Sequence, residues 1–236
     1  MPPARPRSNT FRTGGRYSPS HSPMTRILAV ADEVDESLYG DKLIRLAPDI
    51  VLGCGDLPSD YLEYIVSRLD VPLLYVPGNH DPDLSPVDER WSPLWAEPVS
   101  RGPDGCINVD GRVVEAAGLR VGGLGGSMRY RPGPNQYTPA QMRWRALRIE
   151  LLARLHRPRD GHRLDVLVTH APPEGFSGKE DDPAHRGFAA FNRLTRNLAL
   201  RLLVHGHVHP HGLARPPVRL GGTLIINAIP HRLVVI

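Results

Sequence analysis

Short apolar runs alternate with amphipathic stretches along the first third of the chain. The runs RILAVA (26–31), DIVLG (49–53) and PLLYV (72–76) are separated by SLYGDKLIRLA (37–47) and SDYLEYIVSRL (59–69), where apolar residues recur with helical spacing. Continuous apolar runs are typical of central strands that are covered on both faces. The pattern therefore predicts a βαβαβ unit that begins near Arg26.

The rest of the chain is richer in strand patterns. CINV (106–109) and RVVEA (112–116) flank Asp110-Gly111, a dipeptide that favours a hairpin turn, and LRVGGLGG (119–126) follows as a third strand. A helix is predicted near residues 187–199. Further strands are predicted in RLDVLVTHAPP (163–173), RLLVHGHVHPH (201–211), GGTLIINAI (221–229) and RLVVI (232–236).

One helix, over residues 138–155, is marked by its own start signals. Thr138 and Gln141 have the spacing of a capping box, and Pro139 occupies the first helical position. The apolar residues that recur on one side are Met142, Ala146, Ile149 and Leu152. The arginines, which we interpret as a solvated face in preference to a phosphate site, are Arg143, Arg145, Arg148 and Arg154.

Length and charge indicate one balanced α/β domain preceded by a basic leader. The chain has 236 residues, of which 40% are hydrophobic, enough for a substantial single core. The net charge of +4 equals the four arginines of residues 1–23, so residues 24–236 carry 29 − 4 = 25 basic and 25 acidic residues. We therefore expect no broad nucleic-acid-binding surface.

The leader, residues 1–23, is rich in Pro, Ser, Gly and Arg, and this composition predicts disorder. Three interpretations remain open: translation from Met24 with the domain at 24–236, a solvated tail, or a targeting segment. No apolar run approaches the roughly 18 residues that span a bilayer. Two cysteines, Cys54 and Cys106, are too few for a disulfide framework. We expect a soluble, cytoplasmic protein with no membrane partner.

Each of five apolar runs ends at a residue that can bind a metal. Because functional groups of open α/β sheets gather at the carboxyl ends of the strands, we expect these residues to meet. They are Asp32, Asp56, Asn79, His170 and the pair His207 and His209. Carboxylate, amide and imidazole donors together suit Mn, Fe, Zn or Co, whereas calcium takes oxygen ligands alone.

These residues stand in a recognisable order: Asp32, then Gly55-Asp56, then Gly78-Asn79-His80-Asp81, then His170, then Gly206-His207-Val208-His209. In this order the chain, over residues 24–236, resembles the calcineurin-like metallophosphoesterases. The resemblance implies a four-layer αββα sandwich in which two mixed β-sheets are flanked by helices, with the metal site at the carboxyl ends of the strands.

The resemblance also implies a role for each residue. Asp56 bridges two divalent ions; Asn79, His170 and His207 bind one of them, and Asp32 and His209 bind the other. A metal-bridging hydroxide attacks phosphorus, His80 protonates the leaving oxygen, and Asp81 orients the imidazole of His80. Manganese is the first candidate metal, with iron, zinc, cobalt and nickel as alternatives.

The chain departs from the family pattern at one position. Many members have Asp-x-His where this chain has Asp32-Glu33-Val34. Val34 cannot bind a metal, so we predict weaker occupancy of the position that contains Asp32 and His209. Glu33 or Asp35 can turn inward if the strand has ended.

The expected reaction is hydrolysis of small phosphodiesters or nucleotides by a binuclear metal-dependent phosphohydrolase. Arg129 and His185, in polar loops, are candidates for contact with the phosphate. The sequence does not specify an oligomer. The alternative is a non-catalytic interaction module, because this fold also serves as a scaffold in the retromer coat; His80 argues against that reading and Val34 favours it.

Overall fold

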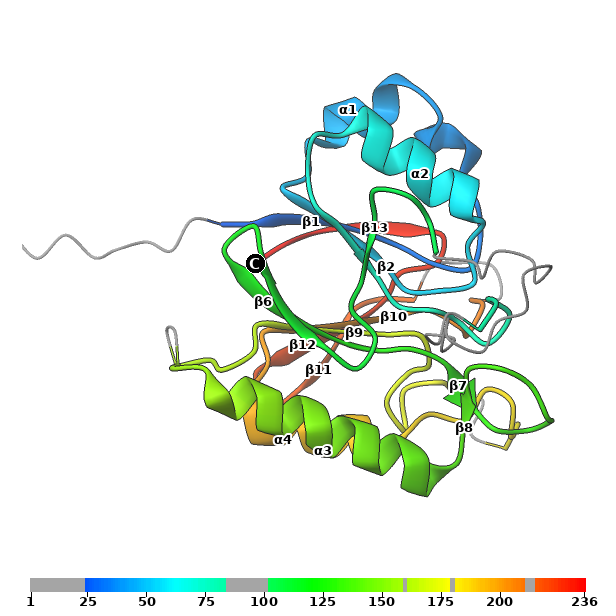
Figure 1. The fold of residues 1–236 in the computed structure, drawn as a ribbon, viewed down its shortest axis with the longest axis vertical. Coiled ribbons are helices and arrows are strands. Elements are labelled where there is room, and N and C mark those ends of the chain that lie inside the picture. Colours follow the sequence, from blue (N-terminus) through cyan, green and yellow to red (C-terminus); the bar gives the residue numbers. More distant parts are fainter. Residues whose placement is uncertain (1–23, 84–101, 159–160, 179–180, 211–214) are drawn as a thin grey trace, which may run out of the picture.

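The structure is a computed structural model, and it describes residues 24–83, 102–158, 161–178, 181–210 and 215–236. The leader at 1–23 lies outside the described residues. Figure 1 shows four layers: helices α1 and α2, a first sheet, a second sheet, and helices α3 and α4. The predicted αββα sandwich is confirmed.

The first sheet is built from the predicted βαβαβ unit. Within the described residues its order is β13-β1-β2-β3-β4, with β1 (Arg26–Val30), β2 (Ile50–Gly53), β3 (Leu73–Tyr75) and β4 (Ile107–Asn108) parallel and β13 (His231–Val235) antiparallel to β1. The 3-10 helix η1 (Glu36–Leu38) and helices α1 (Asp41–Leu46) and α2 (Ser59–Arg68) connect its strands.

The second sheet follows the order β11-β12-β10-β9-β6-β5 in the described part of the chain. Strands β6 (Leu119–Leu124), β9 (Val166–Thr169), β10 (Leu202–His205) and β12 (Thr223–Asn227) are parallel, and the edge strands β5 (Val113–Ala116) and β11 (Val218–Leu220) are antiparallel to their neighbours. Helices α3 (Pro139–Leu155) and α4 (Ala189–Leu198) cover its outer face, and a small sheet pairs β7 (Ser127–Met128) with β8 (Gln136–Tyr137).

Three apolar clusters explain why the strands have continuous apolar runs. In β1, Ile27 and Ala29 point into the core between the two sheets, while Leu28 and Val30 pack with α1 and α2. Leu203 of β10 belongs to the third cluster, beneath α3 and α4. Because successive strand residues face opposite layers, both sets must be apolar.

The prediction of a β-hairpin at Asp110-Gly111 is wrong. Arg112 N donates to Val109 O (2.9 Å), so a tight turn is present, but β4 pairs with β3 in the first sheet and β5 with β6 in the second. The observed hairpin is β5–β6, closed by Ala117-Gly118 with φ values of 49° and 75°. The turn therefore carries the chain from one sheet to the other, a distinction that turn residues alone do not encode.

Helix α3 has the predicted capping box, in which Thr138 Oγ1 accepts from Gln141 N (3.3 Å) and Gln141 Oε1 from Thr138 N (2.9 Å). The arginines of α3 are exposed with one exception. Arg145 is partly buried, pairs with Asp110 and lies 4.1 Å from the centroid of the Tyr137 ring. Its role is structural.

We predict that burial, and not residue type, decides the cost of removing a leucine from the helical layer. Leu203→Ala, at a fully buried site, should lower the free energy of unfolding by about 2–5 kcal/mol. Leu155→Ala, on the outer face of α3, should change it by less than about 0.5 kcal/mol. Chemical denaturation of both variants measures the difference, and equal losses would contradict the layer assignment.

Candidate metal centre

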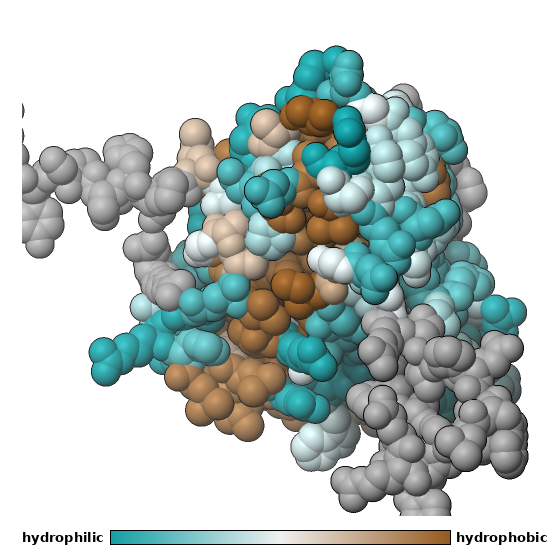
Figure 2. Space-filling model, turned by 45° about the horizontal axis from the view of Figure 1, so that its top comes forward, coloured by the Kyte–Doolittle hydropathy of each residue, from teal (hydrophilic) through white to brown (hydrophobic). Residues whose placement is uncertain are grey.

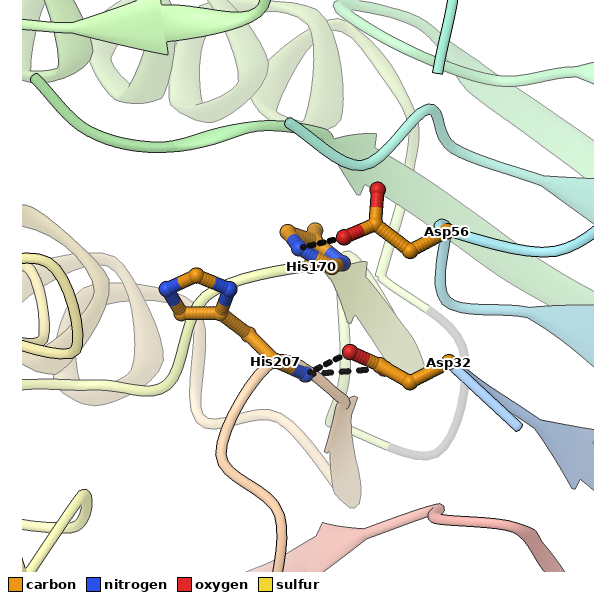
Figure 3. Close-up of side chains that lie close together, drawn as sticks. All are labelled: Asp32, Asp56, His170 and His207. Carbon is orange, nitrogen blue, oxygen red and sulfur yellow. Dashed lines mark hydrogen bonds and ion pairs between the residues drawn. The ribbon is translucent and has the colours of Figure 1, made fainter. Parts of the chain in front are cut away.

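Four of the six predicted metal ligands form one cluster where the two sheets meet. Asp32 follows β1, Asp56 follows β2, His170 follows β9 and His207 follows β10. One nitrogen or oxygen atom from each side chain lies within 4.8 Å of the others. Figure 3 shows the carboxylates and imidazoles converging from opposite sides. The expectation that strand ends would meet is confirmed for these four residues.

Left-handed backbone conformations turn three of these residues into the site. The φ angles are 59° at Asp32, 54° at Asp56 and 67° at His207. Such values cost a residue with a side chain about 1–3 kcal/mol each and persist where surrounding structure imposes them. Hydrogen bonds supply that constraint: His207 N donates to both carboxylate oxygens of Asp32 (2.9 and 3.0 Å), and His80 N donates to Asp56 Oδ1 (2.8 Å).

The glycines of the motifs are needed for close approach. A Cβ atom at Gly206 would clash with the Asp32 carboxylate, and one at Gly78 would clash with the Asp56 carboxylate. At Gly55 it would lie 2.9 Å from His170 Nδ1 and closer still to the backbone of Gly78. Each motif therefore pairs a ligand with the glycine that makes space for the ligand of another strand.

His170 is fully buried and oriented as a ligand by its outer nitrogen. Its Nδ1 donates to Cys54 O (2.8 Å), so Nε2 faces Asn79 Oδ1 (3.0 Å) and Asp56 Oδ2 (3.3 Å). A carbonyl that fixes the tautomer in this way is typical of metal-binding histidines. Burial alone lowers the pKa of His170, but the hydrogen bond to Asp56 and the charges of Asp32 and Asp56 outweigh it and raise the pKa to about 9.

The electrostatics of the cluster favour a cation. Burial disfavours charge on Asp32 and raises the pKa of its carboxyl to about 6. Burial also opposes ionisation of Asp56, yet the hydrogen bond and charge of His170 lower the pKa of that carboxyl. Burial and the charge of His170 lower the pKa of His207 to about 3, so its imidazole is neutral. Two carboxylates and a neutral imidazole form a donor set that a divalent metal fits.

His207 also contacts the polar loop that carries His185, through a backbone atom that the sequence did not identify. Its Nε2 donates to Ala184 O (2.7 Å), which leaves Nδ1 as the nitrogen with a free lone pair. The ring of His207 lies between those of His170 (centroids 4.7 Å apart) and His185 (5.2 Å). No residue pattern identifies Ala184, because its contribution is a backbone carbonyl.

The remaining predicted ligands flank the cluster. Asn79 is 3% exposed, and its Oδ1 is the contact of His170 described above. His209 has 48% of its side chain exposed, with Nε2 3.8 Å from Asp32 Oδ1. His209 Nδ1 donates to Glu33 Oε1 (2.7 Å). Asn79 therefore joins the buried part of the site and His209 its open part.

The residues around Val34 show how the departure from the family pattern is accommodated. Strand β1 has ended at Val30, and Val34 packs against the core beneath α1 and α2. Glu33 stays exposed and accepts from His209 Nδ1 without turning inward, whereas Asp35 caps η1 by accepting from Ser37 N (2.9 Å). Glu33 thus supports a ligand without replacing the absent histidine.

His80 is exposed beside the cluster, tied to it through its own backbone N–H. The Asp81 carboxylate does not have the partner we expected. Its Oδ2 accepts from Gly78 N (2.7 Å) and Asp56 N (3.0 Å), and burial raises its pKa. Asp81 thus joins the loops that carry Asp56 and Asn79; these backbone contacts, and not the imidazole of His80, are what the carboxylate binds.

The two candidates for phosphate contact differ in position. His185 lies beside His207, and its Nδ1 donates to Asp182 Oδ2 (2.5 Å). Arg129 is exposed and directs Nε and Nη2 to Gln136 O (3.3 and 3.1 Å), within its own loop. The structure therefore brings His185 to the metal cluster and engages Arg129 in the β7–β8 connection.

The two cysteines are free. Cys54 is buried, and burial raises the pKa of its thiol well above the ordinary value. Burial likewise raises the pKa of Cys106 to about 11. A thiol with a raised pKa is a poor nucleophile, so both are packing residues. Among the described helices, none combines the length and the apolar composition needed to cross a bilayer.

Comparisons with known proteins agree with this site. A model of the calcineurin-like phosphoesterase family matches residues 21–211. An uncharacterized protein of Haemophilus influenzae is 30% identical over 188 residues, which cover 68% of this chain and 71% of that protein. One solved crystal structure matches with a TM-score of 0.60 and 17% identity, covering 90% of this chain and 98% of its own, and supports the fold alone. The chain therefore belongs to the calcineurin-like phosphoesterase family and is a metal-dependent hydrolase of phosphoester bonds.

Proposed function

We propose that the protein is a binuclear phosphodiesterase that acts on small phosphodiesters or nucleotides, with manganese as the first candidate metal. The observation that carries the proposal is the position of Asp56 between two sets of donors. Its Oδ2 lies 3.3 Å from His170 Nε2, which also contacts Asn79 Oδ1, and the carboxylate of Asp32, close to His209, belongs to the same 4.8 Å cluster. A carboxylate shared in this way is the usual bridge of two-metal hydrolases.

The donors divide into two groups around that bridge. In this proposal Asn79, His170 and His207 bind one ion, and Asp32 and His209 bind the other. When bound, the two ions acidify water at neutral pH and neutralise the phosphoryl oxygens. The protein's own contribution is to hold the imidazoles in the correct tautomers through Cys54 O, Ala184 O and Glu33.

His80 is the proposed acid for the leaving oxygen. Its backbone N–H donates to Asp56 Oδ1 (2.8 Å), which places the His80 backbone beside the proposed bridging carboxylate. The residue itself is exposed to solvent. His185, held by Asp182, is the proposed contact for a phosphate oxygen, because it lies against the ring of His207. Arg129 is a less direct second contact, since its guanidinium binds its own loop.

The proposed substrate class rests on the net charge of residues 24–236 and on the side chains that are exposed beside the cluster. Residues 24–236 carry equal numbers of basic and acidic residues, so the domain has no net attraction for a long polyanion. Among the described residues, the exposed groups next to the cluster include the single side chains of His80, His209 and Glu33, which suit a small ester. Cytoplasmic localisation stays a prediction.

A direct assay tests the proposal. The purified chain with Mn²⁺ is offered a p-nitrophenyl phosphodiester, the matching phosphomonoester and cyclic nucleotides in parallel. We expect faster release from the diester and hydrolysis of at least one cyclic nucleotide. Faster release from the monoester would contradict the substrate class, and no hydrolysis with any of Mn, Fe, Zn, Co or Ni would favour the non-catalytic alternative.

Replacement of the proposed acid should slow turnover without loss of metal. We expect His80→Ala to reduce kcat by roughly 10²- to 10⁴-fold, the usual contribution of a general acid. Metal content, measured by elemental analysis, should not change, because the His80 contact with Asp56 is made by the backbone. His156→Ala, on the far side of the second sheet at the end of α3, is the control and should retain full activity. An unchanged kcat in His80→Ala would remove its catalytic role.

The two metal positions should differ in retention. We predict that mild chelation removes one ion first, because Val34 leaves Asp32, Asp56 and His209 as the protein ligands of that ion. Glu33→Gln should weaken this ion about 10- to 100-fold, since the carboxylate orients His209. Metal-to-protein ratios after dialysis against a chelator measure both effects. Two equally retained ions in the unsubstituted protein would refute the prediction.

A further inference from the structure

Helix α3 has apolar side chains on two faces, and only one face is used by the fold. The buried residues Met142, Ala146, Ile149 and Ala153 pack on the second sheet. On another side of the helix, Trp144, Leu151 and Leu155 are 74%, 62% and 75% exposed. Their spacing of 7 and 4 residues places them in one stripe along the helix. The outer stripe has no role in the core.

The layer that carries this stripe is also positively charged. Helices α3 and α4 together contain six arginines and one acidic residue, Glu150, a formal charge of +5. On the opposite side of the sandwich, η1, α1 and α2 contain three basic and four acidic residues, a formal charge of −1. Because residues 24–236 are balanced overall, the positive charge is concentrated on one layer.

A groove of about 910 Å³ adjoins the stripe, between α3 and the start of α4. Its wall includes apolar residues, Met128, Trp144 and Phe188, beside one acid, Glu174, and three arginines, Arg143, Arg186 and Arg193. Figure 2 is turned so that the α1–α2 side of Figure 1 comes forward, and the face that it shows carries a band of apolar surface bordered by hydrophilic side chains. The α3 stripe itself is established by the exposed fractions of its three side chains.

We propose that the α3–α4 layer docks on an anionic lipid surface. Exposed leucines and a tryptophan flanked by arginines are the features of helices that lie in the membrane interface, where the apolar side chains enter the acyl boundary and the arginines bind headgroup phosphates. This proposal of peripheral contact departs from the expectation, drawn from the sequence, that no membrane takes part.

The side chains of the stripe favour one of three possible partners: a nucleic acid, a second copy of the chain, or a lipid bilayer. A nucleic-acid strand binds by stacking successive bases on aromatic rings, and this stripe offers a single ring, Trp144, beside Leu151 and Leu155. A second copy of the chain would place one +5 layer against another, which like-charge repulsion opposes. A lipid bilayer with acidic headgroups would bury the leucines in its acyl boundary and would pair its phosphates with the arginines.

Docking in this way has a consequence for the metal centre. The segment that includes Ala184 and Phe188 contacts both places: Ala184 O binds His207 Nε2, and Phe188 lines the groove beside Trp144. A lipid surface against α3 and α4 therefore lies next to the loop that orients a metal ligand.

Co-sedimentation of the full chain with vesicles tests the proposal. We expect binding to mixed phosphatidylglycerol–phosphatidylcholine vesicles, little binding to phosphatidylcholine alone, and release by salt. The double substitution Leu151→Ser with Leu155→Ser should weaken binding about tenfold or more, because interfacial affinity scales with buried apolar area. Arg143→Glu with Arg148→Glu should weaken it by at least a similar factor.

Matched controls on the opposite layer separate this surface from general effects and from the arginines of residues 1–23. Ile44→Ser on α1 and Arg68→Glu on α2 remove exposed residues of the same types and should leave vesicle binding unchanged. Unchanged thermal unfolding midpoints show that each variant is folded. Absence of vesicle binding, equal loss in the control variants, or a self-association in sedimentation that the leucine pair abolishes would each overturn the proposal.

Discussion

Hydrogen bonds between the two sheets fix the geometry on which the site depends. The backbone N–H of His207, after β10, donates to the carboxylate of Asp32, after β1, and His170 Nδ1, after β9, donates to Cys54 O, after β2. Each bond joins a strand end of one sheet to a strand end of the other. The approach is close enough that Gly206 has no room for a side chain. The sandwich is therefore held together at the same edge where its functional groups lie.

Two buried carboxylates lie at that edge, and their negative charge is unfavourable there unless positive charge lies close to them. Asp32 and Asp56 lie in one cluster, where burial raises the pKa of Asp32 to about 6. Burial lowers the pKa of His170, but its hydrogen bond to Asp56 and the two carboxylate charges outweigh this effect and raise it to about 9. A divalent ion held by these groups would supply positive charge in place of protons and would lower the electrostatic cost of the arrangement. Metal binding and the stability of the sheet–sheet contact are thus two aspects of one interaction.

The two helical layers, although equivalent in the architecture, differ in what they offer to solvent. Helices α1 and α2 are nearly neutral, and the loop before them supplies Glu33 to the metal centre. Helices α3 and α4 are rich in arginine, and α3 exposes a tryptophan and two leucines. Since core packing requires only the inner face of a helix to be apolar, the outer face of α3 is available for another function.

Residue patterns alone predicted the layers and the meeting of four candidate ligands. Continuous apolar runs require strands covered on both sides, and a ligand at the end of each run requires the ligands to share an edge, as Asp32, Asp56, His170 and His207 do. Only the tertiary structure decided which strands share a sheet, so the turn at Asp110-Gly111 proved to be a crossing between sheets. It likewise decided that Asp81 binds backbone N–H groups, that Glu33 holds His209 and that Ala184 O orients His207. These contacts depend on loop conformations and backbone atoms, which local residue patterns do not specify.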